Sequence, residues 1–384
     1  MILHELVAYD TLRVIWWALV GLLLVGYAVM DGFSLGTAAL LPFVAKTDIE
    51  RRIAINSVGP VWEGNQVWLV LGGGAVFAAW PHIYAVSFSG FYLAMYAILV
   101  ALILRPVAFK FRSKREGAVW RANWDRILSI SGFMATLIYG VAMGNVLQGA
   151  PFSLGADMRI FYEGSFFDLL NPFALLAGLV SVAMLLTHGA CWLQLKTDDP
   201  VARRARGYGI VTALLSAGLY VLAGVMLAKF VQGYHITSSI ASNGPSNPLL
   251  KSVTVVPGAW FDNYAAHPAL WVVPALGVGG ALLSAIAQVA RKPLLALLTN
   301  GVSIAGIVVS VGVAMFPFML PSTLQPRASL TVWDSSSSHL TLFIIMVGSA
   351  IFLPLILSYT SWVYAVLRGK VDPDAIRDEN NHAY

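Results

Sequence analysis

Long apolar runs separated by short polar stretches dominate this 384-residue chain. An α-helix needs about 20 consecutive apolar residues to cross the hydrocarbon core of a bilayer. Runs that approach or exceed this length cover residues 14–41, 59–80, 84–108, 127–148, 172–195, 208–232, 268–290, 294–320 and 340–367. Because the runs are continuous and do not alternate with period two, they predict helices and not the strands of a membrane β-barrel. The pattern therefore predicts an all-α, polytopic membrane protein with about nine transmembrane helices.

The composition agrees with a membrane protein. Hydrophobic residues make up 58% of the chain and charged residues 11%, whereas soluble domains carry charge on roughly a quarter of their residues. No interval between predicted spans reaches the roughly 50 residues of a small domain, so we expect residues 1–384 to form a single integral membrane domain. Glu5 and Asp10 precede the first span in place of a basic signal-peptide start, so we expect the first helix to remain in the protein.

Lysine and arginine gather in alternate loops. Of these 24 residues, 18 fall on one side of the predicted membrane, five fall on the other, and Arg105 lies inside a span. The more basic side includes Arg51, Arg112, Arg204 and, near the C-terminus, Arg377. Because basic loops stay in the cytoplasm, this bias predicts a periplasmic N-terminus and a cytoplasmic C-terminus, which requires an odd number of helices. It also explains the net charge of +5 without a nucleic-acid partner.

A short repeat links the two halves of the chain. Residues 140–143 and 312–315 both read GVAM, and Asp31 and Gly32 in the first span match His188 and Gly189 at a similar depth in the fifth. Two four-helix bundles with one further helix would explain this repeat, since parallel repeats are common in membrane proteins. Chance would also explain so short a match.

Four ionisable side chains lie inside or at the start of predicted spans: Asp31, Glu63, Arg105 and His188. A charged group in hydrocarbon costs about 2.5 kcal/mol or more, so each requires a partner, a water-filled cavity or a function. With the orientation above, all four fall in the cytoplasmic half of the membrane. Two acids and a guanidinium at one depth indicate either a hydrogen-bonded proton relay from the cytoplasm or a buried ion pair that fixes helix packing.

His188, Met143 and Met315 are the candidates for haem ligation, and we expect Cys191 to serve only in packing. A histidine followed by Gly189 would let a porphyrin approach the helix. The other six histidines lie in loops, termini or span ends, so a second intramembrane histidine is missing from the sequence. A single cysteine excludes an intramolecular disulfide and a cysteine-based metal cluster. We therefore predict that this chain ligates neither haem nor metal.

The most unusual stretch is WEGNQVW at residues 62–68, followed by three glycines at 72–74. Trp62, Asn65, Gln66 and Trp68 lie at the start of a span, where the two amides must bond to other helices and the glycines allow close approach. The stretch is either a helix-packing motif or part of the functional site. Neither a Walker-type loop nor a His-Glu-x-x-His motif occurs in the sequence, which disfavours a membrane ATPase or metalloprotease.

Several motifs follow one another in the order found in a known family. They are residues 13–17 (RVIWW), 31–33 (DGF), 50–57 (ERRIAINS), 62–68 (WEGNQVW), 77–81 (FAAWP), 88–92 (FSGFY), 105–106 (RP), 144–145 (GN), 171–173 (NPF), 314–318 (AMFPF) and 330–334 (LTVWD). Across nearly all 384 residues the chain resembles subunit II of the cytochrome bd-type ubiquinol oxidases, including the cyanide-insensitive quinol oxidase branch.

The resemblance implies a heterodimeric terminal oxidase of the bacterial cytoplasmic (inner) membrane, which oxidises quinol, reduces O₂ to water and takes protons from the cytoplasm. It implies that haem b558, haem b595 and haem d are held by subunit I, and that this chain ligates none of them. Subunit I is the expected partner, and small single-helix accessory subunits, quinone and lipid are further candidates. A multi-helix secondary transporter and a purely structural scaffold are the alternatives.

The resemblance also suggests roles for four residues. Asp31, Glu63 and Arg105 match positions that this family uses at a hydrophilic, proton-conducting path, and Trp68 matches a position beside a proposed O₂ route. The chain departs from many members at Ser34 and at Glu63, where they have aspartate. Because an acid is missing at Ser34, the course of the path stays open.

Overall fold

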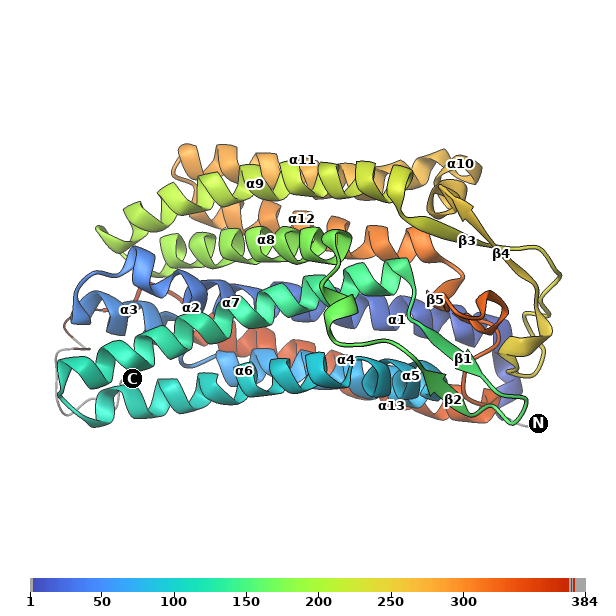
Figure 1. Ribbon diagram of the computed structural model, residues 1–384. Helices are drawn as coiled ribbons and strands as arrows, with labels where there is room; N and C mark the ends of the chain where they lie inside the picture. The colour runs from blue at the N-terminus through green and yellow to red at the C-terminus, as the bar shows by residue number, and fades with distance from the viewer. Residues whose placement is uncertain (1–2, 373, 375, 377–384) are drawn as a thin grey trace.

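The structure, a computed structural model, describes residues 3–372, 374 and 376 as a bundle of long, roughly parallel helices with loops and short strands at one end (Figure 1). Arg377, counted above among the basic residues, lies outside the described part of the chain. The described chain begins at the end that carries the strands, and its last long helix finishes at the opposite end.

The long helices are α1 (Tyr9–Met30), α2 (Gly32–Val44), α4 (Trp62–Ala79), α6 (Tyr92–Phe111), α7 (Ala118–Gln148), α8 (Pro172–Lys196), α9 (Val201–Phe230), α11 (Val272–Val289), α12 (Pro293–Met315) and α13 (His339–Val366). The shorter ones are α3 (Asp48–Val58), α5 (Pro81–Gly90) and α10 (Asp262–Ala266). The strands are β1 (Phe152–Leu154), β2 (Ile160–Tyr162), β3 (Gln232–Ile236), β4 (Val253–Pro257), β5 (Phe318–Leu320) and β6 (Leu330–Thr331).

Eight helical segments of the described chain are long and apolar enough to cross a membrane, and one of them, Tyr9–Val44, joins α1 to α2. α4 corresponds to the predicted span 59–80 but is not among the eight, since Glu63, Asn65 and Gln66 make its first turns polar. The predicted span 84–108 is divided between α5 and α6, which meet at Phe91. The prediction of a multi-pass helical membrane protein is confirmed, whereas the count of nine helices stays a prediction.

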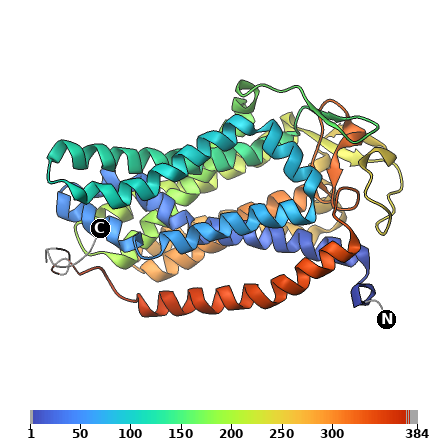
Figure 2. The ribbon, with the colours of Figure 1, turned by 90° about the horizontal axis from the view of Figure 1, so that it is seen from below.

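The helices pack in two groups. α1, α2, α4, α6 and α7 form one group, and α8, α9, α11 and α12 form the other. The groups meet where α8 packs against α2 and α7 and where α12 packs against α1. α13 lies along the edge of the bundle, against α1 and α4, and buries little of its own surface (Figure 2).

Two glycines allow α2 and α8 to cross at very short distance. A Cβ atom added at Gly36 would lie 2.0 Å from the carbonyl oxygen of Leu185, and one added at Gly189 would lie 2.4 Å from the backbone of Gly36. These distances are far shorter than van der Waals contact, so the crossing requires glycine at both positions. It holds α8, which carries His188, against the helix that follows Asp31.

The loops at the N-terminal end form an ordered cap. Three antiparallel hairpins occur there, β1 with β2, β3 with β4, and β5 with β6. The longest pairing, β3 with β4, aligns Gln232 with Pro257 and Ile236 with Val253. The buried guanidinium of Arg13 joins this cap to α1, because Nε donates to Ser336 Oγ at 2.8 Å and Nη2 donates to the Gly244 carbonyl oxygen at 3.0 Å.

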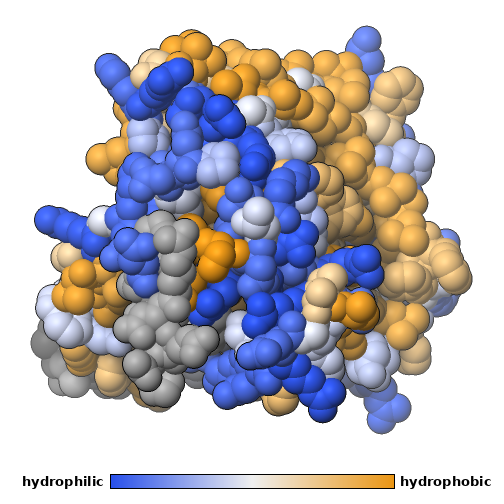
Figure 3. Space-filling view, turned by 90° about the vertical axis from the view of Figure 1, so that its left-hand side faces the viewer, coloured by the Kyte–Doolittle hydropathy of each residue, from blue (hydrophilic) through white to orange (hydrophobic). Residues whose placement is uncertain are grey.

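The opposite end of the bundle is hydrophilic. Seen end-on, polar residues cover its centre, and hydrophobic residues line much of the rim (Figure 3). α3 lies at this end. A polar end with apolar sides suits a bundle that spans a membrane, and this is the end that the loop charges predict to be cytoplasmic.

Candidate functional site

Asp31 occupies a break in the first membrane helix. α1 ends at Met30, and α2 begins at Gly32. The Asp31 N–H donates to the Tyr27 carbonyl oxygen, and the Asp31 carbonyl oxygen accepts from Leu35 N, both at 2.9 Å. Aspartate and glycine have low helix propensity, which favours an interruption at this point. The break places a carboxyl group in the interior of the bundle.

Arg105 of α6 forms a fully buried ion pair with Asp31. Its Nη1 and Nη2 atoms donate to the same oxygen, Asp31 Oδ2, at 3.1 and 3.0 Å, and both side chains are 0% exposed. Gln66 Oε1 also accepts from Arg105 Nη2 at 3.4 Å, and the guanidinium carbon lies 5.4 Å from the centre of the Trp62 ring. The other oxygen, Asp31 Oδ1, is buried without a hydrogen-bond partner among the described residues. Only one carboxylate oxygen therefore accepts from Arg105, and Tyr27 and Ser34 are the other polar side chains close to the carboxyl group.

Asn65 connects three helices beside this pair. Its Nδ2 donates to Ser34 Oγ of α2 at 3.3 Å, and its Oδ1 accepts from the Tyr364 hydroxyl of α13 at 2.7 Å. Ser34 lies three residues after Asp31, so both belong to the same side of the helix. Both amides of the WEGNQVW stretch thus bond to neighbouring helices, which brings α13 into the site.

Glu63 lies apart from the buried pair. Its side chain is 66% exposed in the first turn of α4, and it lies 3.9 Å from Lys110 Nζ, whose side chain is 59% exposed. The sequence led us to expect one hydrogen-bonded relay of Asp31, Arg105 and Glu63, but the structure joins only the first two. The physical reason is position along the helix, since a charge in the first turn of α4 remains solvated at the hydrophilic end of the bundle.

His188 has both ring nitrogens in hydrogen bonds. Nε2 lies 3.0 Å from the Val29 carbonyl oxygen, and Nδ1 lies 3.1 Å from Asn300 Nδ2. A haem iron would have to displace one of these partners, so the residues around His188 do not fit a haem. Among the described residues, no group of three or more His, Cys, Asp or Glu side chains could hold a metal ion.

Trp68 fills the contact between α4 and α1. A Cβ atom added at Gly26 would lie 2.7 Å from the Trp68 ring, which is buried. In the same hydrophobic cluster the Tyr27 hydroxyl donates to the Tyr139 hydroxyl oxygen at 2.5 Å. Trp68 therefore holds two helices together, and its role beside an O₂ route stays a prediction.

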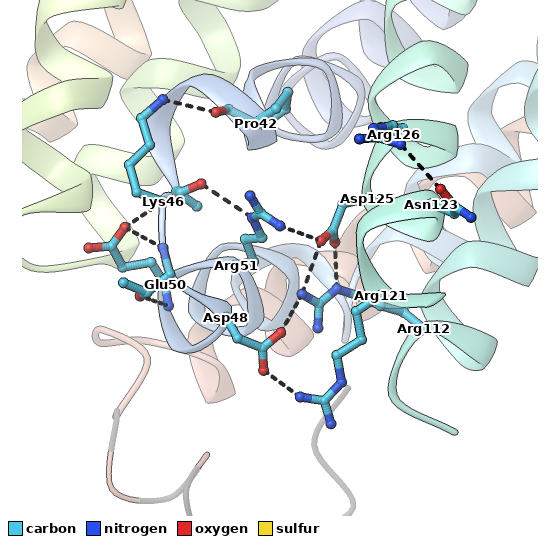
Figure 4. A network of polar contacts seen from close by, with 12 residues as sticks. Pro42, Lys46, Asp48, Glu50, Arg51, Arg112, Arg121, Asn123, Asp125 and Arg126 are labelled. Carbon is cyan, nitrogen blue, oxygen red and sulfur yellow. Dashed lines mark hydrogen bonds and ion pairs between the residues drawn. The ribbon is translucent and has the colours of Figure 1, made fainter. Parts of the chain in front are cut away.

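A charge network closes the hydrophilic end of the bundle (Figure 4). Asp125 of α7 accepts from Arg51 Nη1 at 3.0 Å and from Arg112 Nε at 2.5 Å. Arg112 and Arg121 each pair with a different oxygen of Asp48, both at 2.8 Å. These bonds join α3 to the ends of α6 and α7 and fix the geometry of the end nearest Asp31.

Glu50 anchors the start of α3 at the same end. It forms a capping box with Thr47 and an ion pair of 2.7 Å with Arg204 Nη1 at the start of α9. Burial raises the pKa of Glu50, but hydrogen bonds from Arg204 and from the backbone N–H groups of Lys46 and Thr47 outweigh it and hold the pKa below its usual value. Its charge therefore stabilises the folded end.

The sequence pattern does not single out Asn300 or Tyr364, although both bond to predicted site residues. A signal was present, because an amide within an apolar span requires a partner on another helix. That partner could not be identified before the helices were packed, since Asn300 lies 112 residues from His188.

The comparisons with known proteins cover nearly the whole chain. The family model for cytochrome bd terminal oxidase subunit II matches residues 12–367. The probable cytochrome oxidase subunit 2 of Haemophilus influenzae is 47% identical over 98% of this chain and 100% of its own length. Cytochrome bd-I ubiquinol oxidase subunit 2 of Escherichia coli strain K12 is 45% identical, over 98% of this chain and 100% of its own length.

A solved structure shares the fold. A chain of the bd oxidase from Geobacillus thermodenitrificans superposes with a TM-score of 0.67 at 17% identity, over 93% of this chain and 99% of that chain. At this identity the likeness concerns the fold alone, and it agrees with the relationship seen in the sequences. The chain belongs to the cytochrome bd terminal oxidase subunit II family.

Proposed function

We propose that this chain is the second subunit of a cytochrome bd-type quinol:O₂ oxidoreductase of the bacterial cytoplasmic (inner) membrane. Family membership and the multi-pass helical fold support this function. The relative from Escherichia coli is named a ubiquinol oxidase subunit, which suggests quinol as the substrate class. The observation that carries this chain's own part in the reaction is the buried pair of Asp31 and Arg105, with one carboxylate oxygen free.

The haems of the complex, haem b558, haem b595 and haem d, are assigned to subunit I. The hydrogen bonds on both nitrogens of His188 support this assignment. When bound, the haems supply the electron-transfer and oxygen chemistry. The chain described here supports the haem-bearing subunit and delivers protons. Small single-helix accessory subunits, bound quinone and bound lipid stay predictions.

The proton path is assigned to Asp31, Arg105, Gln66 and Glu63. Reduction of O₂ to water consumes protons as well as electrons, so a buried acceptor is required. Asp31 takes a proton on Oδ1 while Arg105 stays bonded to Oδ2, so the guanidinium keeps its partner in both states. Gln66 accepts from Arg105 and lies one turn of α4 from Glu63. Glu63, exposed at the hydrophilic end, exchanges protons with water.

The membrane arrangement follows from the same assignment. α4 serves as a ninth crossing. Despite its polar start, it packs beside α1 and lies along the long axis of the bundle. The order of packing supports two four-helix units, the first ending at α7 and the second at α12, with α13 added at the edge. The N-terminus then lies on the periplasmic side and the end with α3 in the cytoplasm.

The test compares two variants of the whole complex, purified through a tag on this chain. We expect Asp31→Asn to lower quinol-dependent O₂ consumption per haem d about a hundredfold, because the amide cannot accept the proton. We expect Glu63→Gln to lower it about tenfold. Asp125→Asn is the matched control, because it neutralises a buried, arginine-bound acid outside the path. Unchanged turnover in both path variants would favour a structural scaffold.

The same preparation tests the oxidase assignment itself. A partner subunit should co-purify with haem b and haem d signals in the reduced-minus-oxidised spectrum. A colourless, solitary and inactive protein would favour the secondary transporter instead.

A further inference from the structure

His188 of α8 contacts the helix break that carries Asp31. Its Nε2 donates to the Val29 carbonyl oxygen at 3.0 Å. Val29 lies in the last turn of α1, two residues before Asp31. The His188 ring also lies 3.8 Å from the position that a Cβ atom at Gly32 would take. His188 therefore touches the chain on both sides of Asp31.

Asn300 of α12 determines the tautomer of His188. Asn300 Nδ2 donates to His188 Nδ1 at 3.1 Å and lies 3.3 Å from the Met184 carbonyl oxygen. An accepting Nδ1 and a donating Nε2 define the neutral imidazole with its proton on Nε2. Both side chains are buried. The donor to the Val29 carbonyl oxygen is thus fixed by a residue from a third helix.

We propose that His188 and Asn300 are positioning residues for proton uptake. They hold the break in the geometry in which Arg105 bonds to Asp31 Oδ2 and leaves Oδ1 free, so this inference rests on the proposed proton path. The hydrogen bond from His188 ties α8 to the end of α1, so its loss would let α1 shift at the break and carry the Asp31 carboxyl group with it. A buried imidazole and a buried amide are costly unless hydrogen-bonded, so packing alone favours apolar side chains at both positions.

A movement of Asp31 would change its distance to every titratable group around it. Four of them interact with Asp31 directly: Tyr27 of α1, Arg105 of α6, Tyr139 of α7 and Tyr364 of α13. His188 of α8 bonds to the chain two residues before Asp31. The pH dependence of turnover therefore reports on the position of the carboxyl group. The amount of assembled complex reports only on folding and assembly, so it does not test the position of the carboxyl group.

The experiment measures O₂ consumption per haem d in the whole complex, over a pH series and in D₂O. His188→Leu removes the donor to Val29 and should lower turnover about tenfold or more, with a shifted pH profile and a larger solvent isotope effect. His188→Gln keeps a side-chain N–H donor and should restore most of the turnover. Thr187→Val is the control, because it removes a buried α8 hydrogen bond, 2.8 Å to Thr212, that faces α9.

A second variant, Asn300→Ala, leaves the ring in place and removes only its orienting donor. We expect a smaller loss than in His188→Leu and a shift of the pH profile in the same direction. Suppose that Asp31→Asn is slow, but that the pH profile and the isotope effect are unchanged in both His188→Leu and Asn300→Ala. This result would overturn the positioning role and leave the proton path standing. Normal turnover in Asp31→Asn would instead overturn the proton path on which it rests.

Discussion

Both Nη atoms of Arg105 donate to a single oxygen of Asp31, at 3.1 and 3.0 Å, and the second oxygen has no hydrogen-bond partner among the described residues. A side-by-side pairing would have used both oxygens. Oδ2 therefore accepts both hydrogen bonds from Arg105, and Oδ1 is the oxygen to which the proposed proton path adds a proton.

The ion pair should be strongly coupled. Arg105→Leu leaves a buried carboxylate without a partner and should destabilise the complex by about 3–5 kcal/mol. Combining it with Asp31→Asn removes the unpaired charge, so the double variant should recover part of that loss. The midpoint of thermal unfolding of the purified complex measures both effects. A double variant that is less stable than Arg105→Leu alone would contradict the prediction.

The crossing of α2 and α8 should not accept a side chain at Gly36. Gly36→Ala places a methyl group 2.0 Å from the Leu185 carbonyl oxygen and should destabilise the protein by about 3 kcal/mol or more. Gly21→Ala is the matched control within the same span, since nothing lies within 4 Å of its added Cβ atom. There, alanine should be neutral or slightly stabilising. Yield of assembled complex and thermal midpoint are the measurements, and equal behaviour of the two variants would refute the close crossing.

The start of α3 should loosen in acid because of Glu50. Its pKa is lowered in the folded protein from 4.5, so the folded state favours the charged form. The stabilisation is complete above pH 4.5 and is lost as the pH falls through the lower folded pKa. Hydrogen exchange of the α3 amides should therefore accelerate on acidification. In Glu50→Gln the amides of α3 should exchange faster at neutral pH than in the unsubstituted protein, and their exchange should change little on acidification. If the variant still responds to acid, the response belongs to another group.

The cap at the N-terminal end of the bundle should open when Arg13 is removed. Besides its bonds to Ser336 and Gly244, Arg13 Nη2 donates to Ser246 Oγ at 3.1 Å, and the guanidinium lies 3.7 Å from the centre of the Tyr9 ring. Arg13→Ala should cost about 3 kcal/mol locally, because hydrogen bonds to a charged group are lost. Protease added to the purified complex should then cleave residues 242–246 faster. Arg327→Ala, at an exposed arginine of the same cap, should leave cleavage unchanged.

Much of the fold could be predicted from the sequence, because helix formation in a membrane depends on each segment by itself. In lipid every backbone polar group must be satisfied within its own segment, so long apolar runs specify helices wherever they occur. The runs located most helices to within a few residues, and the loop charges predicted the orientation. Asp31 and Arg105 also stood out locally, because a charge in an apolar span is costly whatever surrounds it.

The partners of these residues required the tertiary structure. Asp31 and Arg105 are 74 residues apart. Their pairing depends on how the segment of α1 and α2 is rotated against α6, which apolar runs do not specify. The same holds for Glu63, which the sequence grouped with them but which the structure turns outward, and for Asn300, which it joins to His188. The sequence by itself determined which segments form long apolar helices and which charges need a partner, because those costs are local. Only helix packing decided which partner each charge meets, because close contacts such as that of Gly36 with Leu185 set the rotation of each helix.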